Sequence, residues 1–255
     1  MPTISATIIT KNEASRIETC LQSLIWVDEI IVLDSGSSDN TVEICKRFTS
    51  QVYETEWSGF GIQKNRAIEK ATGDWILSID ADEVVTPELR LEIQQAISTG
   101  NFSGFEIPRL SSYCGQFIQH SGWRPDYVPR LFQSNKGQFS DSPIHERLNI
   151  NGTIGQLKAS LIHHSFENLE QVLNKVNHYS TLGAEQLYRR GKSASLTKAI
   201  LKGWWAFFRT FILKAGFLDG AKGLMLAISN AEGTYYKYAK LILLHEKDRN
   251  GNTQN

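Results

Sequence analysis

Hydrophobic runs and helix-type spacing alternate through about the first hundred residues of this chain of 255 residues. Short β-branched runs predict three strands, at residues 4–10, 29–33 and 51–54, and a fourth that starts at Trp75 and ends at the carboxylates of Asp80 and Asp82. Apolar residues at helical spacing predict helices between them, around residues 17–24, 42–44 and 62–71. This alternation predicts a doubly wound, mainly parallel α/β sheet, in which the first, second and fourth strands end at one edge.

After Pro87 the pattern becomes less regular. A helix at residues 87–97 precedes short strands at 104–108 and 127–132, with many loop residues between them. We expect this region to form an irregular flap across the edge of the sheet. Beyond Leu169 the apolar spacing is helical, so we predict an α/β domain at residues 1–168 and a helical extension at 169–255.

Composition favours a folded protein, since 41% of the residues are hydrophobic and the formal net charge is zero. The cysteine content favours a reducing compartment. The three cysteines are too few and too scattered for a disulfide framework or a zinc site. The amino terminus shows no secretory signal, and no window approaches the roughly 18 apolar residues of a membrane span. We therefore expect a cytoplasmic protein, with no nucleic acid among its partners.

The zero net charge hides a basic segment. From Gln186 to Lys214 there are seven lysines and arginines and no acidic residue. Such a segment suggests a polyanionic partner, either an anionic membrane surface or a phosphorylated lipid.

A helix over residues 196–216 would carry a broad apolar arc beside a narrow stripe of Lys198, Lys202 and Arg209, with Trp205 inside the stripe. Tryptophan and lysine both suit the headgroup level of a membrane, which favours a helix lying on its inner face. The alternative is an ordinary helix that covers the α/β domain and turns its basic side to water.

Polar residues gather at the three strand ends that are expected to meet. They are Thr10 with Asn12 and Glu13, Asp34 with Asp39, and Asp80 with Asp82. Asx turns and helix caps use the same residue types, so each group alone has a structural explanation. Together, at one edge, they predict a nucleotide site in which close carboxylates hold Mg²⁺ or Mn²⁺ and the ion holds a diphosphate. Lys64 is either a phosphate contact or a solvated helix lysine.

The motifs in this region resemble those of family 2 glycosyltransferases of the GT-A fold. They are Ile-Ile-Thr-Lys-Asn-Glu at 8–13, the run from Ile30 through Asp34 to Thr41, Gln-Lys-Asn-Arg-Ala at 63–67, and the segment from Gly73 to Glu83. By this resemblance Thr10 and Asp34 contact the nucleotide, Asp80 binds the ribose or the metal, and Asp82 binds the metal. Glu13, at the same strand end as Thr10, is expected to bind the nucleotide sugar as well. Lys64 departs from the arginine that many members have at this position.

Later segments resemble, more narrowly, the bacterial lipopolysaccharide core β-glucosyltransferases of that family. They are Arg130-Leu-Phe, His145-Glu146, His163-His164-Ser-Phe and Phe217-Leu-Asp-Gly. This resemblance implies transfer of a sugar, expected to be glucose, from a UDP-linked donor to a lipopolysaccharide core or other lipid-linked acceptor, at the cytoplasmic face of the membrane.

Inverting transfer needs an electrophile for the leaving diphosphate and a base for the acceptor hydroxyl. The base must be a carboxylate of the irregular region, and the candidates are Asp126, Asp141 and Glu146. We favour Glu146, beside His145 and Arg147; the alternative is a surface pair between Glu146 and Arg147. His163, at the end of another apolar strand, is either a further metal ligand or a structural histidine.

Two other functions share some of these features. A strand followed by Asp80-Ala-Asp82 also fits the first motif of phosphatases of the haloacid dehalogenase type, but three strand–helix units precede it here. A non-catalytic module that binds nucleotide sugars or glycans would keep the polar edge and need no base.

Overall fold

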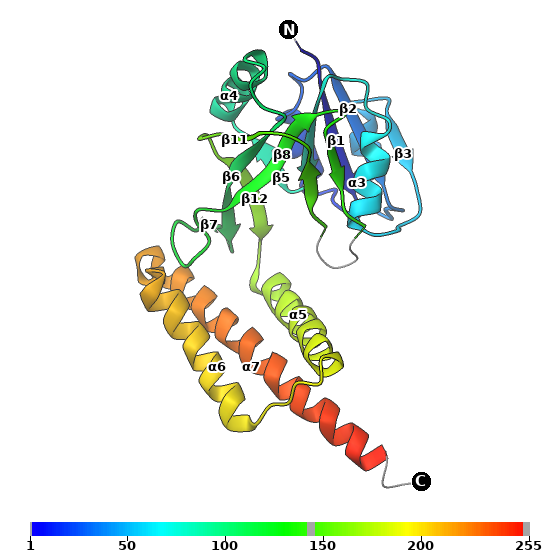
Figure 1. Cartoon of the computed structure of the whole chain (residues 1–255). Helices are drawn as coiled ribbons and strands as arrows, with labels where there is room; N and C mark the ends of the chain where they lie inside the picture. The colour runs from blue at the N-terminus through cyan, green and yellow to red at the C-terminus, as the bar shows by residue number, and fades with distance from the viewer. Residues whose placement is uncertain (1, 142–145, 252–255) are drawn as a thin grey trace. The chain divides into compact units, whose positions relative to one another are not determined.

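The computed structural model describes residues 2–141 and 146–251, and for 249–251 the backbone alone. The chain divides into two compact units, which are described separately below (Figure 1). The first consists of Met1–Leu110 with Pro125–His163, and the second of Ser111–Arg124 with His164–Asn255. The boundary predicted at residue 168 lies near the point after His163 where the chain passes from the first unit to the second. Nothing in the sequence indicated that residues 111–124 would join the helical unit.

The first unit contains the predicted parallel strands, in the order β3-β2-β1-β4. Their bounds are β1 Ile4–Thr10, β2 Glu29–Asp34, β3 Val52–Glu54 and β4 Trp75–Asp80. The connecting helices are α1 (Ile17–Gln22), α2 (Thr41–Lys46) and α3 (Phe60–Ile68). Because Thr10 pairs with Asp34 and Ile9 with Asp80, the strands end level with one another. The predicted edge therefore exists.

The core explains why these strands form. Both faces of β1, β2 and β4 are almost completely buried, as near-continuous apolar runs predict for parallel strands covered on two sides. The large side chains of Ile8, Ile31 and Leu77 are fully buried. Rigid packing of this kind fixes the strand ends, and hence the side chains that follow them.

The region predicted as a flap instead extends the same sheet. Strand β8 (Tyr127–Gln133) pairs antiparallel with both β4 and β6 (Gly104–Tyr113), and β12 (Leu161–Phe166) with β5 (Glu83–Val85) follow in the sheet order. The smaller strands are β7 (Gln116–Phe117) and β11 (Ile154–Gln156) beside β6, and the pair β9 (Gly137–Phe139) and β10 (Leu148–Ile150). Helix α4 (Pro87–Ser98) begins at Thr86, whose hydroxyl accepts the Leu89 N–H. The prediction of a flap was wrong, because pairing between strands that are far apart in the sequence leaves no local pattern in either segment.

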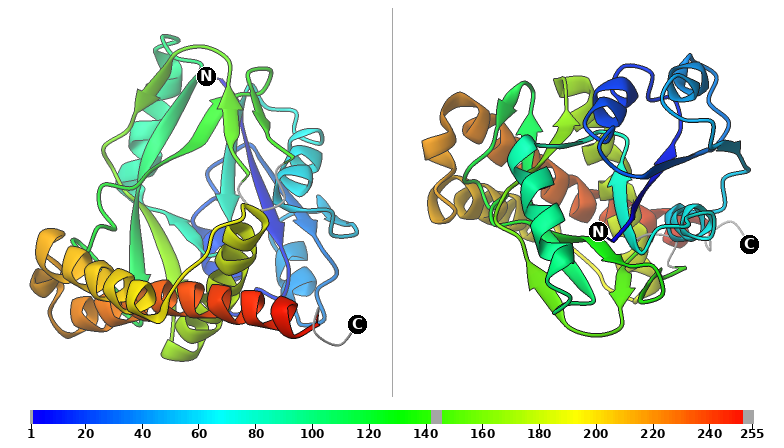
Figure 2. Two further views of the ribbon diagram at one scale, coloured as in Figure 1. Left: turned by 60° about the horizontal axis from the view of Figure 1, so that its bottom comes forward. Right: turned by 90° about the horizontal axis from the view of Figure 1, so that it is seen from above.

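The second unit is mainly helical. It contains α5 (Leu169–Arg189), α6 (Leu196–Phe208), a π-helical turn η1 (Arg209–Leu213), a 3₁₀ turn η2 (Gly216–Asp219) and α7 (Gly220–Gly251). Helix α6 runs beside α7, as two views show (Figures 1 and 2). Among the described residues, no helix combines the length and hydrophobicity needed to cross a bilayer.

The buried carboxylate of Asp219 fastens residues 119–121 within this unit. It accepts the N–H groups of Gln119 (3.0 Å) and His120 (3.1 Å) and the hydroxyl of Ser121 (2.7 Å). The Tyr113 hydroxyl adds a hydrogen bond to Ser229 at 3.1 Å. The Phe217-Leu-Asp-Gly motif therefore has a structural role, because its aspartate supplies acceptors to a loop that lacks regular pairing.

Candidate active site at the carboxyl edge of the parallel strands

The first two strand ends bring Thr10 and Asp34 side by side. Asp34 is fully buried, and its carboxylate accepts the N–H groups of Gly36 (2.9 Å) and Ser37 (2.7 Å) and the Ser37 hydroxyl. It therefore orders its own turn, in which Gly36 has a φ of +81° that favours glycine. The Thr10 Oγ1 is buried with no hydrogen-bond partner among the described residues. A ligand hydrogen bond at Thr10 would remove the cost of that unpaired group.

The loop after β1 is locked to the turn after β2. Asn12, at a φ of +55°, accepts the Ser38 N–H at 2.8 Å and donates its own N–H to the Ser37 hydroxyl at 2.8 Å. The next residue, Glu13, lies at the same edge with its carboxylate 3.9 Å from Arg16. The residues predicted at the first two strand ends therefore form one connected surface.

Lys64 joins two of the predicted site residues. Its side chain is only 6% exposed, and its Nζ lies 2.9 Å from Asp80 Oδ1 and 3.3 Å from Glu146 Oε1. The alternative of a solvated helix lysine is therefore wrong. Glu146 has Lys64 as its described partner, so its carboxylate faces the site, whereas the sequence also allowed a surface pair with Arg147.

The Gln-Lys-Asn-Arg-Ala motif of α3 holds the surrounding segments. Gln63 donates to the hydroxyls of Ser35 (2.9 Å) and Thr55 (2.8 Å), and Asn65 exchanges two hydrogen bonds with the Phe139 backbone. A Cβ atom on Gly61 would lie 2.0 Å from the Ser140 carbonyl oxygen, so the segment that leads towards Glu146 packs directly on glycine. These contacts position Lys64 between the strand end and that segment.

Arg130 on β8 is a site residue that the sequence analysis did not assign to a role. Its guanidinium donates to the carboxylates of Asp80 and Glu83, the latter at 2.7 Å, and Glu83 is fully buried. Glu83 also accepts the Asp80 N–H at 3.0 Å and lies 3.5 Å from Arg109. The sequence signals were the Arg130-Leu-Phe segment of the family resemblance and the presence of an arginine inside the apolar run Val-Pro-Arg-Leu-Phe. Charges of opposite sign therefore alternate from Lys64 to Arg109.

These cations fix the charge state of Asp80. Burial by itself raises the pKa of a carboxyl group, but Arg130 and Lys64 outweigh it and hold the pKa of Asp80 well below its usual range. Burial likewise opposes the charged form of Arg130, but Asp80 and Glu83 raise the pKa of this guanidinium above its ordinary value. Asp80 is thus a permanent anion, unsuited to exchanging protons during a reaction.

Asp82 and His163 form the candidate metal pair. Asp82 Oδ2 lies 3.3 Å from His163 Nε2, both side chains are mostly buried, and Arg16 lies 4.0 Å from the same carboxylate. Among the described residues, no group of three His, Cys, Asp or Glu side chains could hold a metal ion. One carboxylate and one imidazole still fit Mg²⁺ or Mn²⁺ if diphosphate oxygens and water complete the shell, which is how such ions bind in many phosphate sites.

The three base candidates occupy different surroundings. Asp126 is held by Arg109, with 2.9 Å between its Oδ2 and the guanidinium. Asp141 is exposed. Glu146 is 23% exposed and contacts Lys64, whereas Pro143 to His145 of its motif lie outside the described residues. Glu146 is therefore the candidate that shares a lysine directly with Asp80, and its role as base stays a prediction.

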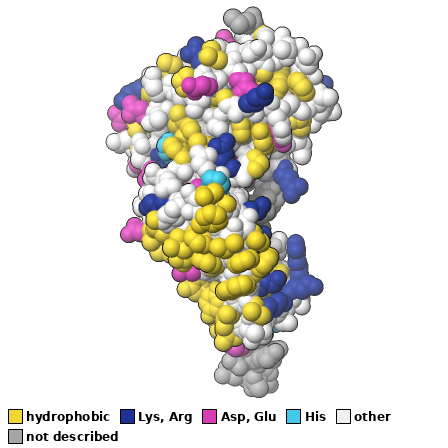
Figure 3. Space-filling view, turned by 90° about the vertical axis from the view of Figure 1, so that its left-hand side faces the viewer, with side chains coloured by type: hydrophobic (Ala, Val, Ile, Leu, Met, Phe, Trp, Pro, Cys, Tyr) yellow, Lys and Arg dark blue, Asp and Glu magenta, His cyan; other side chains and the backbone are white. Residues whose placement is uncertain are grey.

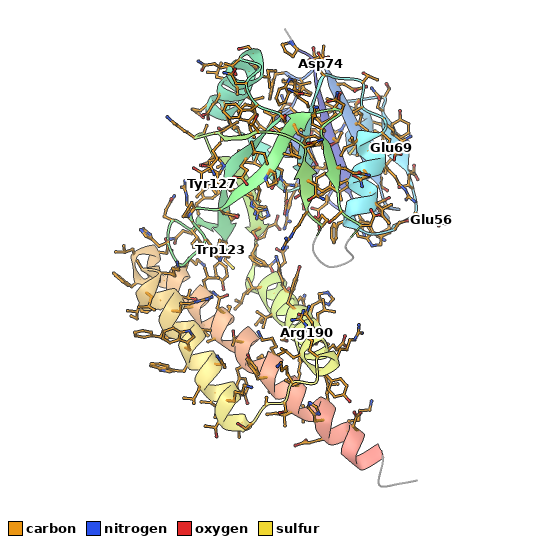
Figure 4. All side chains as sticks on the ribbon, in the orientation of Figure 1. Glu56, Glu69, Asp74, Trp123, Tyr127 and Arg190 are labelled. Atoms are coloured by element: carbon orange, nitrogen blue, oxygen red, sulfur yellow. The ribbon has the colours of Figure 1, made fainter. Side chains whose placement is uncertain are left out.

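The opposite edge of the sheet also carries carboxylates. Asp74 lies there, before β4 (Figure 4). Its carboxylate accepts the N–H and the hydroxyl of Thr3, at 2.8 and 3.0 Å. Neutral local donors thus satisfy Asp74, whereas lysine and arginine surround Asp80.

Comparison with known proteins agrees with this arrangement. The family model "Glycosyl transferase family 2" matches residues 5–155. An uncharacterized glycosyltransferase of Rickettsia prowazekii is 32% identical over 263 residues, which cover 98% of this chain and 90% of the relative. The lipopolysaccharide core biosynthesis glycosyltransferase LpsC of Rhizobium meliloti is 28% identical over 251 residues, which cover 95% of this chain and 93% of LpsC.

A crystal structure of S. aureus TarS in complex with UDP-GlcNAc has the same fold. It aligns with a TM-score of 0.50 at 15% identity and covers 96% of this chain and 92% of the TarS chain. The predicted fold class, a GT-A α/β fold with a C-terminal helical extension, is therefore confirmed. The matched family model and the full-length relatives place this chain in glycosyl transferase family 2.

Proposed function

We propose that this family 2 glycosyltransferase is an inverting, metal-dependent hexosyltransferase that moves glucose from UDP-glucose to a lipopolysaccharide core or other lipid-linked acceptor. The observation that carries the proposal is the position of Lys64, within 3.3 Å of both Asp80 at the strand end and Glu146. On one side of Lys64 lies the anionic end of β4, which suits the donor site. On the other side lies the Glu146 carboxylate, which suits the acceptor site.

The donor side would be formed by Thr10, Glu13, Asp34, Lys64 and Asp80. Thr10 supplies an unpaired buried hydroxyl, and Asp34 shapes the turn beside it. The UDP assignment is supported by the motif resemblance, and TarS of the same fold was crystallised with UDP-GlcNAc. Asp82 and His163 would hold Mg²⁺ or Mn²⁺, which stabilises negative charge on a leaving diphosphate when it is bound.

The acceptor side would depend on Glu146. The acceptor hydroxyl oxygen forms the new bond to the anomeric carbon, its proton passes to the Glu146 carboxylate, and the old bond breaks with its electron pair left on the diphosphate. Asp80 cannot take this proton, because its pKa is held far below neutrality by Arg130 and Lys64. The name of LpsC supports a lipopolysaccharide acceptor. We place the reaction at the cytoplasmic face of the membrane, with peripheral contact to anionic lipid.

The phosphatase alternative fails on family and topology. Strand β4 is the fourth strand along the chain and follows three strand–helix units, whereas in that phosphatase class the Asp-x-Asp strand comes first. A non-catalytic nucleotide-sugar-binding module remains the competing hypothesis, because it needs the same edge without a base.

Glu146→Gln separates these two functions. It keeps the size of the side chain and removes its basicity, so we expect turnover of UDP-glucose with acceptor to fall by about 10²- to 10⁴-fold while donor affinity stays near wild type. The measurements are radiolabelled sugar transfer and donor binding by calorimetry. The control is Glu69→Gln, at an exposed residue that directly follows the helix of Lys64. Normal turnover in Glu146→Gln removes Glu146 as the base, and a wild-type protein that binds donors but transfers no sugar supports the binding module.

A further inference from the structure

Helix α6 buries its small residues and exposes its large ones. Ala199 and Gly203 are its buried residues, and a Cβ atom on Gly203 would lie 3.2 Å from both the Ala231 carbonyl oxygen and the Tyr235 Cβ of α7. By contrast, Leu201 is 61% and Trp204 58% exposed. A surface helix of an ordinary globular protein has the reverse arrangement, with its large apolar side chains against the core.

The exposed apolar side chains continue beyond α6. The set, which we term the apolar face, consists of Leu196, Ile200, Leu201, Trp204, Trp205, Ile212, Leu213, Phe217 and Leu218, each more than 40% exposed. Figure 3 shows hydrophobic side chains gathered over the helical unit, with lysine and arginine beside them. Scattered exposed apolar residues are normal, but a contiguous group of this size marks a surface that another apolar phase covers.

Basic side chains border the apolar face. At 100° per residue, Lys198, Lys202 and Arg209 fall within about 40° of one another. Trp205 lies at the edge of this stripe that faces the apolar side, rather than inside the stripe as first expected. All three basic residues are exposed, and residues 186–218 contain no Asp or Glu. Indole and ammonium groups both favour the headgroup level of a bilayer, and the charge suits anionic lipid.

We propose that the apolar face, with its basic border, docks α6 and the η2 turn flat on an anionic membrane surface. The described helices cannot span a bilayer, so the bound helix lies in the interface, with its large side chains among the acyl chains and its lysines at the headgroups. A second copy of this chain fits less well, because a two-fold contact through this face would bring two basic borders together without acidic partners. This inference specifies the membrane contact and needs no assumption about the donor sugar.

The test is flotation of the full-length protein with phosphatidylcholine vesicles that contain or lack phosphatidylglycerol. We expect binding to the anionic vesicles, and a loss of at least about tenfold in the Leu201→Ser/Trp204→Ser double variant, because both side chains lose their apolar insertion. Leu91→Ser, at an exposed leucine of α4, is the matched control and should bind as wild type does. Lys198→Gln/Lys202→Gln should weaken binding to anionic vesicles about tenfold at low salt, and the binding that remains should depend less on salt than that of the wild type.

Three results would overturn the inference. They are no binding of the wild type to anionic vesicles, equal binding by Leu201→Ser/Trp204→Ser, and a concentration-dependent dimer in sedimentation that this same variant abolishes. UDP-glucose binding, measured in parallel, separates this inference from the proposed function: the surface variants should keep wild-type donor affinity. Lost vesicle binding with intact donor binding locates the effect in the apolar face, whereas a wild type that docks but binds no donor contradicts only the proposed function.

Discussion

The two ends of strand β4 carry aspartates in opposite kinds of surroundings. Asp74, before the strand, is exposed, and its carboxylate accepts hydrogen bonds from the N–H and the hydroxyl of Thr3. Asp80, at the other end, lies between Lys64 and Arg130. The pKa of Asp74 is lowered chiefly by a backbone N–H, and that of Asp80 by two cations that outweigh its burial.

This contrast separates a structural carboxylate from one that shapes a binding site. Neutral backbone and hydroxyl donors are enough to satisfy an anion beside solvent, and they need no ligand. Cations buried with several carboxylates instead create a fixed field in a site shielded from water, where charge acts strongly on a bound diphosphate. A charged side chain removed from the carboxyl edge should therefore cost more than one removed elsewhere on the unit.

The largest effect is expected for Arg130→Met. It leaves the buried Glu83 and its neighbour Asp80 without their shared guanidinium, so the free energy of unfolding should fall by about 3–5 kcal/mol. Urea denaturation followed by circular dichroism measures this loss.

Arg47→Met is the matched control, because Arg47 pairs with Glu18 at 3.2 Å where both side chains are more than half exposed. It should cost no more than about 1 kcal/mol. Equal losses in Arg130→Met and Arg47→Met would show that the buried ion pairs of Arg130 contribute no more to the free energy of unfolding than an exposed ion pair does.

The second effect concerns the metal pair. In Asp82→Asn the anionic ligand becomes neutral, so donor affinity in Mn²⁺ should fall by about 10- to 100-fold, and a chelator should weaken the wild type to the same level. Asp74→Asn, at the opposite edge, should leave donor affinity unchanged. The metal assignment is wrong if the wild type binds donor equally well with and without chelator.

Local patterns were enough to predict the parallel half of the sheet. Strand β1 has the predicted bounds 4–10, and β2 and β3 differ from prediction by one residue each, because apolar runs and turn residues are properties of neighbouring positions. The placement of Asp80 and Asp82 at the same edge as Thr10 and Asp34 followed from the parallel order alone.

The rest of the site depends on contacts between distant segments. Arg130 reaches Asp80 because β8 pairs antiparallel with β4, with Phe132 opposite Ile76, and no periodicity in either segment specifies that partner. The burial of Glu83 likewise depends on β5 pairing with β12. Glu83 directly follows Asp82 in the sequence and was given no role there, and only the sheet order shows that it is enclosed.

The smallest effect concerns Glu29, at the edge of the sheet where the parallel strands begin, and is measured as a change of stability with pH. Burial raises the pKa of Glu29, but hydrogen bonds from the Ser5 hydroxyl, the Thr72 N–H and the Gln51 amide outweigh it, so its pKa in the folded protein is lowered. The charged form therefore stabilises the fold fully above the unfolded value of about 4.3, and this stability is lost as pH falls through the folded value.

Glu29→Gln removes this titration and should cost under about 1.5 kcal/mol near neutral pH. The gap between wild type and variant should narrow as the pH is lowered from about 7 to about 3, measured by urea unfolding at each pH. A gap that stays constant over this pH range would mean that the contribution of Glu29 to stability does not depend on its ionisation. The two edges would then differ more sharply, because the negative charge of Glu29, at the edge where the strands begin, would contribute nothing to stability.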